Sequence, residues 1–185
     1  FRRKKMVGDE RWYEKIALSY TGHVSNSIST KEDLLFKSNL IKDWRNGWEH
    51  RIPVSANFTL FKYINISPNF NFTDRMYTNK VMREWDTQQS KIVQDTTYGF
   101  YNVFNYYGSL SADTKLYGFY KPWKIFGDKV QAIRHIFTPS ISFSAAPDFS
   151  SPRYGFWKTL SYVNERGETV TEKYSPFSNG IFGTV

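Results

Sequence analysis

Hydrophobic and polar positions alternate with a period of two along several stretches of this chain. The pattern is clearest over 137–145, where small polar residues at Thr138, Ser140, Ser142 and Ser144 separate the apolar residues Phe137, Pro139, Ile141, Phe143 and Ala145. Successive side chains of a strand point to opposite sides, so this stretch predicts a β-strand with one apolar and one polar face. Its length is close to the roughly 9–11 residues that a tilted strand needs to cross a bilayer.

A second alternating stretch predicts a β-hairpin. Its arms are residues 52–60 and 64–73, and the three residues Phe61, Lys62 and Tyr63 are the predicted turn. If Leu60 lies opposite Ile64, the residue numbers of facing pairs sum to 124, and apolar residues face apolar residues throughout. Pro53, Pro68 and Pro139 lie inside predicted strands, where each removes a backbone donor, so bulges are expected.

The remaining segments complete a pattern of about six strands. Further strands are predicted over 14–28 and 96–118, with a last strand beginning near Ser178. Residues 29–49 are predicted to be a loop, with a short helix as the alternative. The segments 75–92 and 149–175 read as long loops or strand extensions, the latter with a hairpin around 164–168, and 120–130 reads as a turn.

Composition narrows the fold class to an antiparallel transmembrane β-barrel. Aromatic residues make up 19% of the 185 residues, Asn, Ser and Thr are abundant, and no apolar run is long enough for a membrane-spanning helix. About six strands cannot close a barrel, because closed membrane barrels begin at about eight strands. The chain starts at Phe1 and stops at Val185 in what reads as mid-strand. We therefore expect residues 1–185 to be a fragment of one barrel domain without a second domain, its edges covered by the rest of its barrel or by another protein.

The polar face of this wall is expected to line a watery lumen. Its residues are neutral and small, whereas an exposed face of a soluble protein usually carries Lys and Glu. The predicted lumen-facing residues are Asn65, Ser67, Asn69, Asn71, Ser140 and Ser142. Barrels have short periplasmic turns and long extracellular loops, so the turns at 61–63 and 120–130 are expected on the periplasmic side. Aromatic residues at the three periplasmic ends predict an interfacial girdle: Trp12, Tyr13, Phe61, Tyr63, Tyr120 and Trp123.

Charge and candidate chemistry add little to this picture. The net charge is +8, and six of the basic residues fall within the first 15 positions, where they suit a solvated segment or anionic lipid headgroups. Nucleic acid is not an expected partner, because no recognition motif accompanies the basic run. There is no cysteine, and the three histidines lie in different segments. We expect no enzyme activity and no catalytic, cofactor-binding or metal-binding residues.

One strand resembles a known family. Arg134 and His135, then Pro139 within the alternating strand, then Pro147 and Asp148 are similar to the Arg-His-x-x-x-Pro strand of LptD, the lipopolysaccharide-assembly protein of the Gram-negative outer membrane. The resemblance implies insertion of lipopolysaccharide into the outer leaflet without chemistry. It also implies as partners lipopolysaccharide and outer-membrane lipid, an LptE-like lipoprotein and periplasmic proteins that bridge lipopolysaccharide to the barrel.

Two questions stay open at the level of sequence. Arg134 either anchors the start of its strand through hydrogen bonds to turn carbonyls or meets lipopolysaccharide phosphates or a partner protein. The wall itself suits a porin or a nutrient transporter equally well, and a soluble glycan-binding β-sandwich would show the same alternation.

Overall fold

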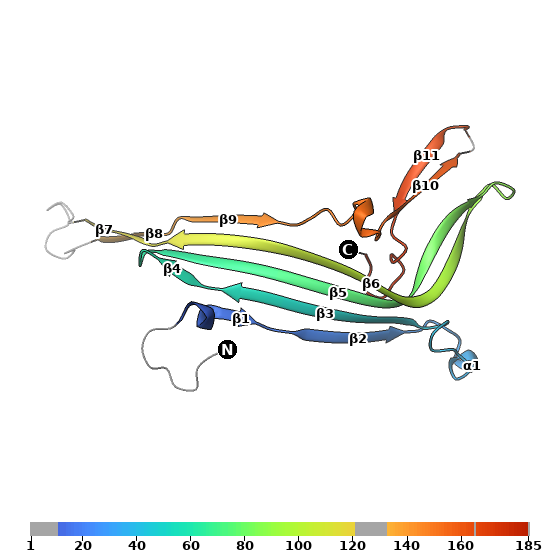
Figure 1. Cartoon of the computed structure of the whole chain (residues 1–185), viewed down its shortest axis with the longest axis horizontal. Coiled ribbons are helices and arrows are strands. Elements are labelled where there is room, and N and C mark those ends of the chain that lie inside the picture. Colours follow the sequence, from blue (N-terminus) through green and yellow to red (C-terminus); the bar gives the residue numbers. More distant parts are fainter. Residues whose placement is uncertain (1–10, 121–132, 165, 185) are drawn as a thin grey trace. The chain divides into compact units, whose positions relative to one another are not determined.

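The computed structural model describes residues 11–120, 133–164 and 166–184. Most of this part of the chain is β-strand, with one single-turn α-helix and short 3-10 turns (Figure 1). In chain order the elements are η1 (Trp12–Lys15), β1 (Ile16–Leu18), β2 (Thr21–Ser27), α1 (Glu32–Leu35), β3 (Arg45–Ala56), β4 (Phe58–Leu60), β5 (Ile64–Asp86), β6 (Lys91–Thr114), β7 (Leu116–Tyr120), β8 (Ile133–Phe137), β9 (Ser140–Ala145), η3 (Pro152–Tyr154), β10 (Lys158–Val163) and β11 (Thr169–Tyr174).

The strands pair antiparallel, which confirms the predicted all-β class. Within the described residues the largest sheet has seven strands in the order β1-β3-β5-β6-β9, with β2 also paired to β3 and β4 to β5. Two smaller sheets pair β7 with β8 and β10 with β11. The described strands do not close into a barrel, since β1 and β9 end the path.

The chain divides into two compact units. Each of the long strands β3, β5 and β6 contributes residues to both units. The first unit comprises Phe1–Ser19, Pro53–Asn71 and Tyr107–Ala146, and the second comprises Tyr20–Ile52, Phe72–Tyr106 and Pro147–Val185.

In the first unit, the pairing of β6 with β9 sorts side chains by polarity. Gly108, Leu110 and Ala112 lie opposite Ala145, Phe143 and Ile141, while Ser109, Ser111 and Asp113 lie opposite Ser144, Ser142 and Ser140. Facing residues of an antiparallel pair share a side of the sheet, so one side is wholly apolar and the other wholly polar. On the apolar side Ile141 is 74% exposed and Phe143 69% exposed. The two-residue rhythm is therefore confirmed here, and no described layer covers its apolar side.

The predicted hairpin is present, with the predicted register at its turn. Leu60 pairs with Ile64 and Phe58 with Ile66. The turn is closed by a 3.1 Å hydrogen bond from the Tyr63 N–H to the Leu60 carbonyl. The two residues between them, Phe61 and Lys62, have φ of 50° and 65°, as the central residues of a type I′ turn do.

Of the three prolines expected to interrupt strands, only Pro139 lies at a break. Pro53 and Pro68 lie inside β3 and β5, whereas the break in the first arm falls at Asn57, between β3 and β4. The predicted strand 137–145 is interrupted at Thr138 and Pro139, where β8 ends before β9 begins. Proline has no N–H with which to continue the ladder, although the Pro139 carbonyl still accepts a hydrogen bond from the Thr114 N–H.

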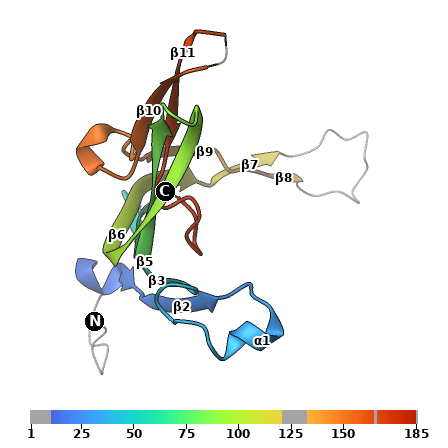
Figure 2. The ribbon, with the colours of Figure 1, turned by 90° about the vertical axis from the view of Figure 1, so that its right-hand side faces the viewer.

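In the second unit, aromatic side chains form the core. Tyr77 and Val103 are fully buried, and Phe156 and Phe177 pack with them. The β10–β11 hairpin lies beside the ends of β5 and β6 at the 86–91 connection (Figures 1 and 2). Trp85 of β5 stacks on Tyr162 of β10, with ring centroids 4.8 Å apart.

Three other predictions need correction. The first strand begins at Ile16, because residues 12–15 form η1. Residues 29–49 are not one loop: α1 occupies 32–35, the helix held as the alternative, and β3 starts at Arg45. Residues 178–184 form turns and no strand. The segment 75–92, predicted as a long loop or as strand extensions, is strand on both sides of a short turn. The hairpin around 164–168 is confirmed, and most of the predicted 120–130 turn lies outside the described residues.

Candidate functional site

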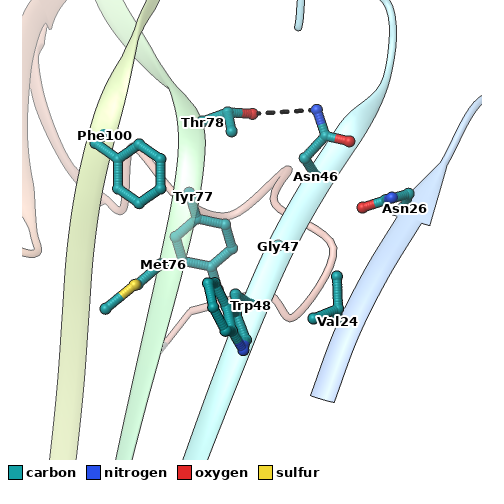
Figure 3. Close-up of a pocket in the computed structure, with 9 residues that line it drawn as sticks. All are labelled: Val24, Asn26, Asn46, Gly47, Trp48, Met76, Tyr77, Thr78 and Phe100. Carbon is teal, nitrogen blue, oxygen red and sulfur yellow. Dashed lines mark hydrogen bonds between the residues drawn. The ribbon is translucent and has the colours of Figure 1, made fainter. Parts of the chain in front are cut away.

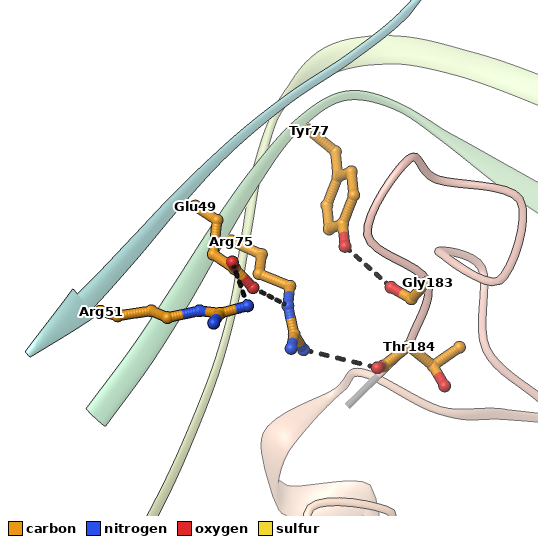
Figure 4. Close-up of polar contacts among 6 residues, drawn as sticks. All are labelled: Glu49, Arg51, Arg75, Tyr77, Gly183 and Thr184. Carbon is orange, nitrogen blue, oxygen red and sulfur yellow. Dashed lines mark hydrogen bonds and ion pairs between the residues drawn. The ribbon is translucent and has the colours of Figure 1, made fainter. Parts of the chain in front are cut away.

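A buried carboxylate lies between two arginines on β3 and β5 (Figure 4). The Glu49 side chain is only 5% exposed and pairs with Arg75 Nε at 3.0 Å and with Arg51 Nη2 at 2.7 Å. Arg75 is mostly covered, whereas the Arg51 side chain is 61% exposed. A buried carboxylate needs compensation by charge and hydrogen bonds, and the two guanidinium groups supply both.

The segment Ser175–Thr184, called here the C-terminal strap, covers this cluster. Tyr77 Oη donates a 2.7 Å hydrogen bond to the Gly183 carbonyl. Arg75 Nη1 donates a 3.4 Å bond to the Thr184 carbonyl. Both strap acceptors are neutral backbone oxygens (Figure 4), so the strap satisfies donors of the cluster without adding charge.

Two glycines let the strap approach the sheet closely. A Cβ added at Gly47 of β3 would clash with Ile181 and lie 2.8 Å from the Phe182 ring. A Cβ added at Gly180 would lie 2.5 Å from the Tyr77 ring. The ring of Phe182 also contacts that of His23, with centroids 5.8 Å apart. Any side chain larger than hydrogen at either glycine would therefore force the strap and the sheet apart.

The strap is anchored at its first residues. Ser175 and Phe177 are buried, and Phe177 stacks on Tyr77 with centroids 5.5 Å apart. The Pro176 carbonyl accepts a 2.8 Å hydrogen bond from the Val81 N–H. Ser178 and Asn179, in contrast, are exposed. The strap thus has a fixed root and a distal part held mainly by the contacts to Tyr77, Arg75, Gly47 and His23.

A mainly apolar pocket of about 150 Å³ lies in the same unit. Trp48, Met76, Phe100 and Val24 supply its apolar lining, and Asn46 donates to Thr78 Oγ1 at 3.5 Å beside it (Figure 3). This volume is below the roughly 300–1,000 Å³ of typical ligand pockets.

The residues of the family-motif strand are spread over several elements. Arg134 and His135 lie in β8, opposite Phe119 and Gly118 of β7. The guanidinium of Arg134 lies over the ring of Tyr117, 5.8 Å from its centroid. The turn whose carbonyls Arg134 was predicted to bind lies mostly outside the described residues. Pro139 separates β8 from β9, and Pro147 follows β9.

Asp148 shapes the connection after β9. Its Oδ1 accepts hydrogen bonds from Ser150 Oγ at 2.6 Å and from the Ser150 N–H at 3.0 Å. The Ser150 side chain, then its N–H, lower the pKa of the Asp148 carboxyl. Asp148, the aspartate of the family motif, therefore acts as the hydrogen-bond acceptor of a local turn.

A model of the LptD protein family matches residues 1–185, the whole chain. The chain belongs to the LptD protein family. The comparisons found no match to a curated protein and none to a solved structure. LptD proteins are outer-membrane proteins that act in lipopolysaccharide assembly, and the family is one of transport and assembly proteins, not of enzymes. None of the helices in the described residues is long and apolar enough to span a membrane.

The predicted lumen-facing residues of this LptD chain make polar contacts within the first unit. Asn65 donates to Asp113 at 3.1 Å, and Ser67 donates to Asn57 at 2.7 Å. Asn69 bonds the Ser67 carbonyl. Ser140 and Ser142 share the polar side of β9 with Asp113 and Ser111 of β6. Whether this polar side lines a lumen stays a prediction.

Of the predicted girdle residues that the structure describes, all but the half-buried Tyr13 are well exposed. Trp12 and Tyr13 lie in η1 with their rings edge to face. Phe61 and Tyr63 flank the hairpin turn, and Tyr120 ends β7, all with exposed rings. Trp123 lies outside the described residues. Their place at a membrane interface stays a prediction.

Sequence reasoning missed the cluster of Glu49, Arg75 and Tyr77 in this LptD chain. The predicted hairpin register contained a signal for this cluster. When the two arms of the hairpin are extended at the same register, the residue numbers of Glu49 and Arg75 also sum to 124. The strap carried no such signal: its residues Phe177, Ile181 and Phe182 resemble the start of a strand.

Proposed function

We propose that this chain is part of the β-barrel wall of an outer-membrane translocon that inserts lipopolysaccharide into the outer leaflet. One observation carries the proposal beyond the family match: the β6–β9 strand pair has one side that is wholly apolar, with its large side chains exposed, and another that is wholly polar. Leu110, Ile141 and Phe143 stand on the apolar side. Exposure of such a side to water would be costly, at roughly 25 cal/mol per Å² of apolar surface, so acyl chains are its natural surroundings.

The open edges of the sheet support a barrel that is larger than this chain. Unpaired backbone groups at an edge strand cost several kcal/mol each in hydrocarbon. In the proposed barrel, other strands of the same domain pair with these edges. An LptE-like lipoprotein in the lumen and periplasmic proteins that deliver lipopolysaccharide complete the assembly.

The polar side then forms the path for the sugar part of lipopolysaccharide. Neutral Asn and Ser side chains at Asn65, Ser67, Ser109 and Ser111 offer hydrogen bonds without fixed charge. Such a surface can exchange partners with a moving glycan at little cost, since each hydrogen bond lost is replaced by another with water or sugar. No step of this function requires bond making or breaking.

The alternatives fit less well. The family match favours lipopolysaccharide assembly over a porin or a nutrient transporter. A soluble β-sandwich would bury Ile141 and Phe143 between two sheets, but both are largely exposed.

Depletion of the protein in its own cells tests the proposal. We expect newly made lipopolysaccharide to disappear from the cell surface and to accumulate in the periplasm and inner membrane, as measured by surface labelling and membrane fractionation. Loss of small-solute uptake with normal surface lipopolysaccharide would instead assign the wall to a porin or transporter.

A further inference from the structure

The cluster under the strap has more cationic charge than its carboxylate neutralises. Arg51 and Arg75 share one partner, Glu49, in the described residues, which leaves an excess of one positive charge. Their remaining strap contact is Arg75 to the neutral carbonyl of Thr184, at a long 3.4 Å. Tyr77 adds a hydroxyl donor on the same side. The donors of Arg75 and Tyr77 face the strap, where an anion would supply the negative charge that a carbonyl lacks.

We propose that Arg51, Arg75 and Tyr77 form a binding site for a phosphate group, and that residues 178–184 are a displaceable cover over it. A guanidinium matches phosphate oxygens with two parallel donors. The Tyr77 bond to Gly183 is a neutral one, and bonds to an ionised acceptor are roughly twice as strong. For Arg75, a phosphate adds a Coulombic attraction that the Thr184 carbonyl does not supply.

The build of the strap allows the cover to open without loss of the fold. Its root at Ser175 and Phe177 is buried, whereas Ser178 and Asn179 are exposed. The cover can therefore move about the exposed residues Ser178 and Asn179 while the root stays in the core.

Alternation along β5 relates this site to the proposed path. Arg75 and Tyr77 stand on the same side of the strand as Asn69 and Asn71, because side chains two apart share a side. The source of the phosphate rests on the proposed function: a phosphorylated glycolipid that passes this side is the expected ligand. The anion site itself does not depend on that function.

The experiment measures binding of two probes to the purified full-length protein in detergent. The probes are a diphosphorylated lipid A in mixed micelles and inorganic phosphate, each followed by tryptophan fluorescence and by competition with the other. Arg75→Gln is expected to weaken lipid A binding by about ten-fold or more, the effect of losing one charge-assisted bond. Arg83→Gln is the matched control, since Arg83 is on the same strand but pairs with Glu172, and it should bind within about two-fold of the unaltered protein.

A second pair of variants tests the cover. Gly47→Ala places a Cβ against Ile181 and Phe182 and alters neither arginine, so it should displace the cover and tighten lipid A binding several-fold. Phe182→Ala, which removes the ring contacts to His23 and Tyr77, should act in the same direction without a clash. Gly108→Ala is the control glycine, because its added Cβ meets nothing closer than 3.9 Å.

The outcomes separate the inference from the proposed function. Unchanged binding in Arg75→Gln, or no tightening in both Gly47→Ala and Phe182→Ala, would overturn the covered site. Failure of inorganic phosphate to compete would also overturn it, since the acyl chains would then carry recognition. Competition by phosphate with equal affinity for both probes would keep the anion site and remove its link to a glycolipid. None of these results depends on whether depletion stops lipopolysaccharide delivery.

Discussion

Glu49 and Arg75 face each other across β3 and β5, with the carboxylate 3.0 Å from the guanidinium Nε. Their residue numbers sum to 124, as do those of Leu60 and Ile64 beside the turn and of Asn46 and Thr78, whose side chains are 3.5 Å apart. The hairpin, which the sequence predicts, and the ion pair, which it did not predict, therefore share one register.

Removal of the carboxylate should destabilise the protein more than removal of the exposed arginine. Glu49→Gln leaves Arg75 covered and without its counter-charge, and we expect a loss of about 3 kcal/mol in the free energy of unfolding. Arg51→Gln removes a partner that is 61% exposed, and should cost about 0–1 kcal/mol. Urea unfolding in detergent, followed by tryptophan fluorescence, measures both. Equal losses in the two variants would contradict this account of the cluster.

The hairpin turn offers a stabilising substitution. Phe61 and Lys62 hold positive φ angles, which cost non-glycine residues about 1 kcal/mol or more each. The double variant Phe61→Asn with Lys62→Gly has the preferred residues of a type I′ turn and should raise the free energy of unfolding by about 1 kcal/mol. Tyr63→Gly serves as the control, because φ at Tyr63 is not positive; a similar gain there would show that the turn geometry is not the cause.

Acidification should weaken the connection at Asp148. The pKa of its carboxyl is lowered in the folded chain, so ionised Asp148 stabilises the fold above the ordinary value of 3.8, and this contribution disappears as the pH falls through the lower, folded pKa. Ser150→Ala removes the leading cause and should return the pKa toward 3.8, as measured by NMR titration. Ser151→Ala, whose backbone N–H bonds the Asp148 carbonyl, should leave the pKa in place.

A charge on the apolar side should block assembly, whereas the same charge on the polar side should be tolerated. Phe143→Arg places a cation among acyl chains, at a cost of about 2–4 kcal/mol near the bilayer centre. Ser142→Arg changes the neighbouring residue on the opposite side of β9. Heat-modifiable gel migration of outer-membrane fractions measures how much of each variant folds. Equal folded fractions of Phe143→Arg and Ser142→Arg would show that the two sides of β9 do not face different surroundings.

Most of what the sequence predicted correctly depends on the period-two pattern. Phe143 and Ser142 could be assigned to opposite sides because alternation in a strand is a local property of the backbone. The motif of Arg134, His135 and Pro139 indicated the LptD family, which the family model confirms over the whole chain.

The failures have physical reasons as well. The interruption at Pro139 could not be placed from alternation, because the flanking residues keep the same rhythm on both sides. The polar segment 75–92 fitted a long loop or strand extensions equally well. β5 and β6 continue through it, and Trp85 there packs on Tyr162 from β10, a distant contact that no local pattern reports. The C-terminal strap depends on Gly47, Gly180 and Tyr77, three residues far apart in the chain, and no local pattern reports such a fit.

Spin labels placed one at a time at residues 140–145 test the central claim most directly. Collision with oxygen, which concentrates in the bilayer, and with a water-soluble nickel chelate reports the surroundings of each label. We predict that labels at Ile141 and Phe143 collide mainly with oxygen and that labels at Ser140, Ser142 and Ser144 collide mainly with the chelate. Equal access to both reagents at all six positions would contradict a wall with lipid on one side and water on the other.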